Sequence, residues 1–279
     1  MIMSTKLCLV TGANTGHGKA VATALAKMGA TVVMGCRNVE RAEAARTEVI
    51  TETGNDRISV LPLDLAKQRS VRDAADRFRS EHHKLDVLVN NAGAWWADRR
   101  LSPDGVELVW ATNVVGPQLL TQLLLPSLRA SGAGRIVNVS SIYAGGLDLD
   151  DTEYARRPYS GIQAYQASKQ AGRMLTWTLA DQLRGEPISV NALSPGFMKT
   201  ELGRNAPPAF RAFLALLWPI QVSPERGADT AVWLASSPEV AKFTNQLFVK
   251  RKPVPCKFRD PAACEKLSRS LHLRELMPN

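Results

Sequence analysis

Tyr165 and Lys169 are the residues of this sequence whose types and spacing most directly suggest proton transfer. They stand four positions apart, so on a helix both side chains lie on one face and the ammonium reaches the phenol. A phenol ordinarily titrates at about 10, and a neighbouring cation favours phenolate, so such a phenol can give or take a proton near neutral pH. By itself the pair is also typical of two exposed residues on an ordinary helix. Whether it is catalytic therefore depends on the other residues of the site.

A glycine-rich turn follows the first apolar run, Leu7 to Val10, and precedes a helical pattern that stops at Gly29. Its glycines allow a tight turn and close backbone approach, and the helix N-terminus offers free N–H groups to a pyrophosphate. In this context the sequence predicts a dinucleotide site rather than a plain turn. The expected cofactor contacts are Gly12, Asn14, Thr15, Gly16, His17 and Gly18.

The choice of cofactor depends on the end of the second buried strand, where the chain reads Gly35-Cys36-Arg37-Asn38. An acidic residue there would bind the ribose hydroxyls of NAD, whereas an arginine suits the 2′-phosphate of NADP. No carboxylate is present, so the sequence favours NADP(H), with Arg37 as the phosphate partner and Asn38 beside it. The alternative is a solvated arginine that opens a helix.

Apolar runs alternate with helical patterns along the chain. Strands are expected at Leu7–Val10, Thr31–Cys36, Ile58–Leu63, Leu85–Val89, Arg135–Val139, Ile188–Leu193 and Leu247–Val249; helices are expected at Glu40–Thr53, from Ser70 with Asp73 as a capping pair, at Gly105–Leu125 and at Ala164–Leu183. This order predicts an α/β fold, a Rossmann-type doubly wound parallel sheet of about seven strands with helices on both faces. We expect one catalytic domain over residues 1–279.

Two stretches break the alternation, residues 145–163 and 197–222, and both follow strand ends, where such sheets bind ligands. The packing of a C-terminal tail from residue 250 is left open. Large apolar residues in and near these loops favour a bulky apolar carbonyl or alcohol substrate. The expected substrate contacts are Trp95, Trp96, Tyr143, Phe197, Phe213 and Trp218. Phe213 and Trp218 fit equally well a core or a contact between subunits of a homo-oligomer.

Composition narrows the function classes further. The net charge is +9, yet the basic residues are scattered and lack interleaved aromatic residues, which argues against nucleic acid as a partner. No apolar run is long enough to predict a membrane span. The four cysteines lack paired spacing, so we expect free thiols and a cytoplasmic protein. No metal site is expected, because His82 and His83 lack acidic or cysteine partners at ligand spacing.

Seven short motifs together resemble the short-chain dehydrogenase/reductase family. In order along residues 11–200 they are Thr11-Gly12-x-x-x-Gly16-x-Gly18, Asp64-Leu65, Asn90-Asn91-Ala92-Gly93, Asn113, Ser140-Ser141, Tyr165-x-x-x-Lys169 and Pro195-Gly196. The long interval between Ser141 and Tyr165, and the tail, look most like the retinol-dehydrogenase-like branch. One departure is His17, which stands where the family usually has an aliphatic residue. A buried neutral ring is the more ordinary state, whereas cofactor phosphates would favour a protonated one.

The resemblance implies a hydride-transfer enzyme, an NADP(H)-dependent carbonyl reductase or alcohol dehydrogenase. Tyr165 would then protonate the carbonyl oxygen while the Ser141 hydroxyl holds it; Ser140 is the weaker serine candidate. Lys169 would also bind the nicotinamide ribose, and Asn113 would hold a water that relays protons to it. Further cofactor contacts carried over from the family are Asp64, Leu65, Asn91, Ala92, Gly93, Tyr165, Lys169, Pro195, Gly196 and Thr200. The alternative is a catalytically silent NADP-binding sensor or scaffold, since a fold does not fix a function.

Overall fold

A central sheet organises the part of the chain that the computed structural model describes, residues 3–196 and 222–271. Its eight strands lie in the order β3-β2-β1-β4-β5-β6-β7-β8. They are β1 (Leu7–Thr11), β2 (Thr31–Cys36), β3 (Ile58–Pro62), β4 (Val87–Asn90), β5 (Gly134–Val139), β6 (Ile188–Leu193), β7 (Gln246–Val249) and β8 (Lys252–Val254). The first seven are parallel, as predicted; the eighth is an antiparallel edge strand that the sequence did not predict.

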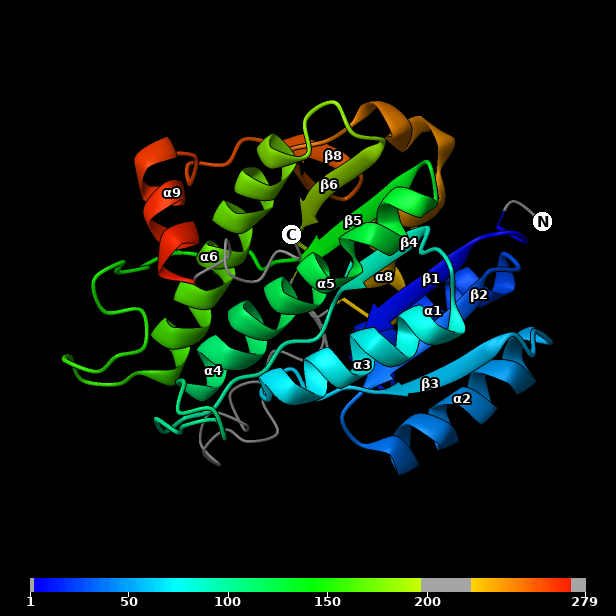
Figure 1. Ribbon diagram of the computed structural model, residues 1–279, viewed down its shortest axis with the longest axis horizontal. Helices are drawn as coiled ribbons and strands as arrows, with labels where there is room; N and C mark the ends of the chain where they lie inside the picture. The colour runs from blue at the N-terminus through cyan, green and yellow to red at the C-terminus, as the bar shows by residue number, and fades with distance from the viewer. Residues whose placement is uncertain (1–2, 197–221, 272–279) are drawn as a thin grey trace.

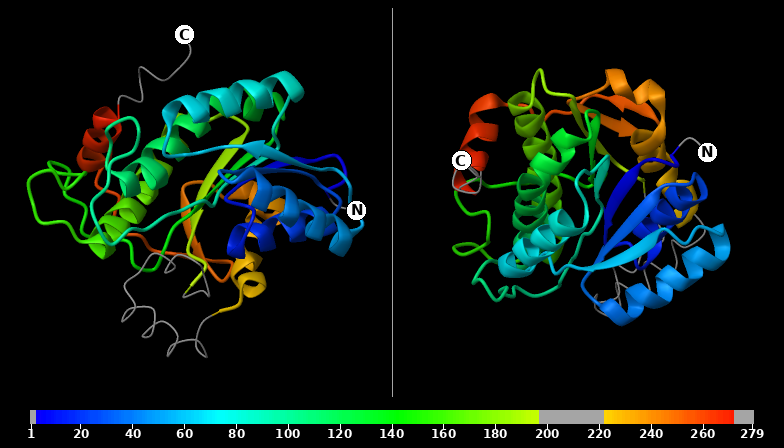
Figure 2. Two further views of the ribbon diagram at one scale, coloured as in Figure 1. Left: turned by 90° about the horizontal axis from the view of Figure 1, so that it is seen from below. Right: turned by 45° about the vertical axis from the view of Figure 1, so that its right-hand side comes forward.

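Helices cover both faces of this sheet (Figures 1 and 2). One face packs on α1 (Gly16–Lys27), α2 (Val39–Thr53) and α8 (Pro224–Ser236), and the other on α3 (Gln68–Glu81), α5 (Gly116–Ala130) and α6 (Gly161–Gln182). Burial on both faces explains why the inner strands read as continuous apolar runs rather than alternating ones. The predicted fold class is therefore confirmed.

The strand order reverses between β1 and β4, which are hydrogen-bonded neighbours. Connections from the two strands leave in opposite directions at such a point and open a crevice at the carboxyl edge of the sheet. The glycine-rich turn after β1 and the Asn-Asn-Ala-Gly turn after β4 both begin there. The fold therefore brings the predicted cofactor motifs together.

The long helix predicted over residues 105–125 is built in three parts. It runs from α4 (Leu108–Trp110) through a π-helical turn, η1 (Ala111–Val115), into α5. By length and composition, Leu108–Ala130 is long and apolar enough to cross a membrane, but 72% of its apolar window is buried inside the protein. Because it packs against the sheet and beside α3, we interpret it as a core helix.

The C-terminal segment, whose packing the sequence left open, belongs to the fold. After the short 3-10 helix η4 (Pro238–Lys242) and β7, β8 returns antiparallel along the edge, and α9 (Pro261–Ser270) packs against α6 (Figure 1). Cys264 and Leu267 of α9 join the apolar cluster around Trp177, and the Arg259 guanidinium lies 4.0 Å from the centre of the Trp177 ring. The last described helix thus covers the helix that carries Tyr165 and Lys169.

Candidate active site

The glycine-rich turn joins β1 to α1 through left-handed backbone at Gly12 and Gly16, with φ of 65° and 52°. A Cβ atom at Gly18 would lie 2.3 Å from the Gly12 oxygen and 2.3 Å from Asn91 Nδ2, so only glycine fits there. The first turn of α1 carries no acidic residue, and Thr15 at its N-cap makes no side-chain capping bond. This cradle fits a diphosphate, because backbone amides and the positive end of the helix dipole face its entrance.

Thr11 and Asn91 hold this turn against the end of β4. The Thr11 hydroxyl accepts hydrogen bonds from the backbone amides of Asn91 and Ala92, both at 3.0 Å, and Asn91 Nδ2 donates to the Thr11 carbonyl at 2.7 Å. The amides of Ala13 and Asn14 face the buried Cys36 thiol at the end of β2. Thr11 was absent from the predicted contacts although it opens the motif, because its role depends on a partner strand distant in sequence.

His17 is buried between the turn and α8. Its Nδ1 lies 2.7 Å from Asn91 Oδ1 and its Nε2 lies 3.2 Å from the Gly227 carbonyl oxygen. Asn91 Nδ2 is already a donor to Thr11, so Asn91 Oδ1 accepts from His17 Nδ1–H. Burial lowers the pKa of His17 and outweighs the two acceptor oxygens, which raise it; the favoured state is the neutral ring, which donates from Nδ1 and makes no N–H donation to Gly227.

Arg37 and Asn38 follow β2 and are both exposed. The Asn38 side chain caps α2 by accepting a hydrogen bond from the Arg41 amide at 2.8 Å, so it has a structural task besides its predicted cofactor contact. Arg37 makes no hydrogen bond or ion pair with any described residue. Its guanidinium is therefore available to an anion from outside the chain.

Asp64 and Leu65 follow β3 beside the same crevice. Asp64 Oδ1 accepts from the Ala66 amide at 3.1 Å, which shapes the turn. Leu65 is buried against the start of α5, where a Cβ atom on Gly116 would lie 2.2 Å from the Leu65 oxygen. These residues thus lie at the carboxyl edge of the sheet, and their contact with the cofactor stays a prediction.

Tyr165 and Lys169 lie on α6 as the spacing predicts, with Lys169 Nζ 5.7 Å from the centre of the Tyr165 ring. The Ser141 hydroxyl lies near enough to the Tyr165 phenol to affect its pKa. Burial raises the pKa of Tyr165, and the Ser141 hydroxyl opposes that rise. The expected lowering by Lys169 is wrong for the protein on its own, because the Lys169 ammonium donates to the Val139 carbonyl at 3.0 Å rather than to the phenol.

Lys169 is itself perturbed. It is 8% exposed, and burial lowers its pKa from 10.5 to about 8. Gly93 lies directly beside it, because a Cβ atom there would be 3.2 Å from Lys169 Nζ and 3.8 Å from Asn113 Oδ1. At Gly93, therefore, the turn after β4 lies directly against the predicted catalytic residues Lys169 and Asn113.

Asn113 lies in the π-helical turn and links two parts of the site. Its Oδ1 accepts from the Ala94 amide at 2.7 Å, and its Nδ2 donates to the Ala94 carbonyl at 3.0 Å and to Ser168 Oγ at 2.9 Å. π-Helical turns occur frequently at functional sites. Ser168 was not predicted, although it directly precedes Lys169. The relay water assigned to Asn113 stays a prediction.

The two serines after β5 have different surroundings. Ser140 Oγ donates to the Lys169 carbonyl at 3.3 Å and accepts from Arg173 Nε at 2.9 Å. Ser141 Oγ accepts from the Tyr143 amide at 3.2 Å, and its hydroxyl meets the phenol. Ser141 therefore faces Tyr165, as the sequence favoured, while Ser140 faces Arg173, which the sequence analysis missed although it falls one turn after Lys169.

The predicted substrate residues are only partly placed. Tyr143 and Ile142 follow Ser141 and are 49% and 50% exposed. Trp96 instead packs in a small core with Tyr154 and Ala164, and Trp95 is also nearly buried, so their contact with substrate stays a prediction. Pro195 and Gly196 follow β6, with a φ of 87° at Gly196. The remaining predicted residues, Thr200, Phe197, Phe213 and Trp218, lie outside the described residues.

The loop predicted at residues 145–163 is ordered by its own contacts and ends where α6 begins at Gly161. The Arg157 guanidinium lies 3.9 Å from the centre of the Tyr154 ring, and the Tyr159 hydroxyl donates to Glu107 Oε1 at 3.1 Å. Glu107 also caps α4 through the amides of Val109 and Trp110. The loop therefore packs onto the helix that leads to Asn113.

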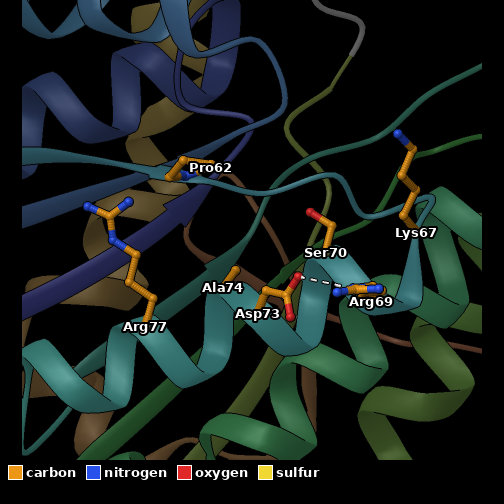
Figure 3. Close-up of a pocket in the computed structure, with 7 residues that line it drawn as sticks. All are labelled: Pro62, Lys67, Arg69, Ser70, Asp73, Ala74 and Arg77. Atoms are coloured by element: carbon orange, nitrogen blue, oxygen red, sulfur yellow. Dashed lines mark ion pairs between the residues drawn. The ribbon is translucent and has the colours of Figure 1, made fainter.

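A surface hollow of about 370 Å³ lies along α3, beside the turn that follows β3 (Figure 3). Lys67, Arg69 and Arg77 line it, and Arg69 pairs with Asp73 at 3.8 Å. No predicted site residue lines it, so we interpret it as a solvated helix face. Within residues 3–196 and 222–271, no group of three His, Cys, Asp or Glu side chains is arranged to hold a metal ion.

Comparisons with known proteins agree with this arrangement. A family model described as short chain dehydrogenase matches residues 6–209. Retinol dehydrogenase 13 of Homo sapiens is 38% identical over 260 residues, which cover 90% of this chain and 78% of that protein. Retinol dehydrogenase 14 of Homo sapiens is 37% identical and covers 95% of this chain and 85% of that protein.

Solved structures give the same result. The Pseudomonas aeruginosa RhlG/NADP active-site complex superposes with a TM-score of 0.70 at 29% identity, over 88% of this chain and 95% of that chain. The family match spans most of the sequence, and its motifs converge on one crevice of the sheet. The chain therefore belongs to the short-chain dehydrogenase family, in its retinol-dehydrogenase-like branch, and is a hydride-transfer oxidoreductase.

Proposed function

We propose that this protein is an NADP(H)-dependent oxidoreductase that interconverts a bulky apolar ketone or aldehyde and its alcohol. The observation that carries the proposal is the approach of the Ser141 hydroxyl to the Tyr165 phenol, which opposes the burial-driven rise in the pKa of that phenol, one helical turn from the buried Lys169. A proton donor and a second hydrogen-bond donor that converge on one point suit an oxygen that gains negative charge.

The protein side of the reaction follows from these contacts. When bound, the nicotinamide supplies or accepts the hydride. Tyr165 gives its proton to the carbonyl oxygen as negative charge grows there, and the Ser141 hydroxyl donates a hydrogen bond to the same oxygen. Lys169 donates to the Val139 carbonyl, and its ammonium lies 5.7 Å from the centre of the Tyr165 ring, on the same helix face. Asn113 fixes Ala94 and Ser168, and so holds the walls of this pocket in place.

Arg37 supports NADP(H) over NAD(H). Its guanidinium is exposed, has no described partner and follows β2, where a 2′-phosphate would lie. An arginine can give two charge-assisted hydrogen bonds to a phosphate, whereas ribose hydroxyls alone offer weaker acceptors.

Apolar side chains at the mouth of the site support a bulky apolar substrate. Ile142 and Tyr143 directly follow Ser141, and Ile162 precedes Tyr165 by one turn; they are 50%, 49% and 46% exposed. Exposed apolar groups that gather near a reacting centre favour an apolar ligand. Both human relatives are named retinol dehydrogenases, and retinol is an alcohol of this class. A cytoplasmic location and a homo-oligomer remain part of the proposal.

The test is NADPH oxidation with a panel of bulky apolar ketones and aldehydes. Tyr165→Phe should lower kcat by about 10²- to 10⁴-fold, because it removes the proton donor and keeps the ring. The matched control is Tyr154→Phe, which removes a buried hydroxyl that has no described partner and should leave kcat unchanged. Equal rates in the wild type and Tyr165→Phe would refute the mechanism. NADPH binding without turnover of any carbonyl would favour the sensor or scaffold.

A further inference from the structure

Arg173 is a buried cation without a carboxylate partner among the described residues. It is 8% exposed and lies on α6 one turn beyond Lys169, on the face that carries Tyr165 and Lys169. Burying a charge is unfavourable unless it is paired or fully hydrogen-bonded. The contacts of the Arg173 guanidinium therefore indicate its role in the site.

The guanidinium donates to the two serines that follow β5. Arg173 Nη2 lies 2.5 Å from the Ser141 carbonyl oxygen, and Arg173 Nε lies 2.9 Å from Ser140 Oγ. Ser140 Oγ in turn donates to the Lys169 carbonyl at 3.3 Å. One planar group thus joins the backbone that carries Ser141 to the helix that carries Tyr165 and Lys169.

The C-terminal segment covers the other side of Arg173. Arg173 Nη1 lies 4.0 Å from Cys256 Sγ, and the guanidinium carbon lies 5.8 Å from the centre of the Phe258 ring. These neighbours keep water from competing for the donors. Hydrogen bonds are stronger in such a low-dielectric setting, so the Ser141 carbonyl is held firmly.

We propose that Arg173 is a positioning residue for Ser141: its bond to the Ser141 carbonyl sets the direction in which the Ser141 hydroxyl meets the substrate oxygen and Tyr165. This inference rests on the proposed function. Arg173 does not touch the reacting atoms, and it acts through the backbone of residues 140 and 141. A hydroxyl displaced by even a small distance loses most of its value to a transition state, because such donors act through preorganised geometry.

A double-mutant cycle separates positioning from a general structural role. We expect Arg173→Gln to lower kcat about ten- to a hundred-fold, the value of a hydrogen bond from a charged group, with little change in the Kd for NADPH. In a Ser141→Ala background the same change should lower kcat less than about two-fold, because no hydroxyl remains to be positioned. Arg173→Lys, which keeps the charge but not the paired donors, should fall between wild type and Arg173→Gln.

Arg135 provides the matched control at the opposite end of β5. Its Nη1 also donates to two carbonyl oxygens, those of Leu234 and Ser237, at 3.1 and 2.8 Å. Arg135→Gln should therefore change stability without a loss of kcat that depends on Ser141. An equal loss of kcat from Arg173→Gln in both backgrounds would overturn the proposal.

A second readout does not depend on turnover. The Ser141 hydroxyl opposes the rise in the Tyr165 pKa, so Ser141→Ala should raise that pKa in a tyrosinate absorbance titration referenced to Tyr165→Phe. Arg173→Gln should raise it too, and should add less when Ser141 is already Ala. Additive shifts would overturn positioning even if no carbonyl is reduced. If the wild type reduces no carbonyl of the panel but the shifts in the Tyr165 pKa are non-additive, the proposed function is refuted and the positioning role of Arg173 stands.

Discussion

The substitution Lys169→Met should change the free energy of unfolding more favourably at pH 7 than at pH 10. Lys169 is 8% exposed, and burial lowers its pKa from 10.5 to about 8. The native state therefore holds a desolvated cation at pH 7, while the unfolded chain solvates the same cation fully. Met has a similar length and no charge, so it removes this penalty at every pH.

The magnitude follows from the linkage between protonation and folding. Between about pH 8 and 10.5 the unfolded chain binds more protons at this site than the native state, so wild-type stability rises with pH across that window. The penalty is about 3 kcal/mol at pH 7 and falls below about 1 kcal/mol at pH 10. Lys169→Met also removes the hydrogen bond to the Val139 carbonyl, but that loss affects the free energy of unfolding at both pH values and so contributes little to the difference between them. The difference in unfolding free energy between variant and wild type should thus shift by roughly 2 to 3 kcal/mol.

Urea unfolding of both proteins without cofactor, at pH 7 and at pH 10, measures this shift. Lys252→Met is the control, because Lys252 is exposed on β8 and should show no such pH dependence. If Lys169→Met and wild type differ by the same free energy at both pH values, the native state does not hold Lys169 as a desolvated cation.

Two further predictions concern the cofactor and the buried histidine. Wild type should prefer NADPH to NADH by about ten- to a hundred-fold in kcat/KM, and Arg37→Asp should reverse the preference because the new carboxylate repels the 2′-phosphate. Arg69→Asp on α3 is the charge-matched control. An unchanged ratio of the two kcat/KM values in Arg37→Asp would show that Arg37 is only a solvated residue. Because burial lowers the pKa of His17 from 6.5, the native state resists its protonation and wild-type stability should fall as pH drops below about 6.5. His17→Leu should flatten that fall and the exposed His83→Leu should not, and parallel pH profiles for wild type and His17→Leu would contradict the assignment.

The sequence predicted best those features that are encoded locally. The segment from β1 through the glycine turn to α1 follows from a short apolar run, glycines in left-handed backbone and helical periodicity. The end of α2 was equally legible, because Gly54 adopts the left-handed conformation typical of a helix C-terminus. The spacing of Tyr165 and Lys169 likewise placed both on one face of α6.

Features that depend on distant partners were missed. The predicted capping pair of Ser70 and Asp73 is wrong, because α3 begins at Gln68 and the Gln68 amide is bound at 2.8 Å by Asp104, far along the chain. Ser70 Oγ instead accepts from the Asp64 amide. α8 was not predicted at all, although Ser223 and Pro224 carry a recognisable helix start.

The direction of the Tyr165 pKa could not be read from spacing. Helical periodicity places Lys169 near the ring, but it does not reveal that the Val139 carbonyl binds the ammonium or that desolvation raises the pKa of the phenol. The same limit applies to Arg173, whose helical position was visible while its partners on residues 140 and 141 were not. Desolvation and backbone acceptors are properties of the assembled fold.

The packing of α9 on α6 has a consequence for the order in which the chain can fold during synthesis. The ribosome releases α6 well before α9, and the apolar side chains around Trp177 stay uncovered until the later segment emerges. Nascent chains that stop before residue 252 should therefore expose an apolar helix face and bind chaperones or aggregate. Chains that extend through residue 271 can bury that face within their own sequence, so α6 is covered only after α9 has been synthesised.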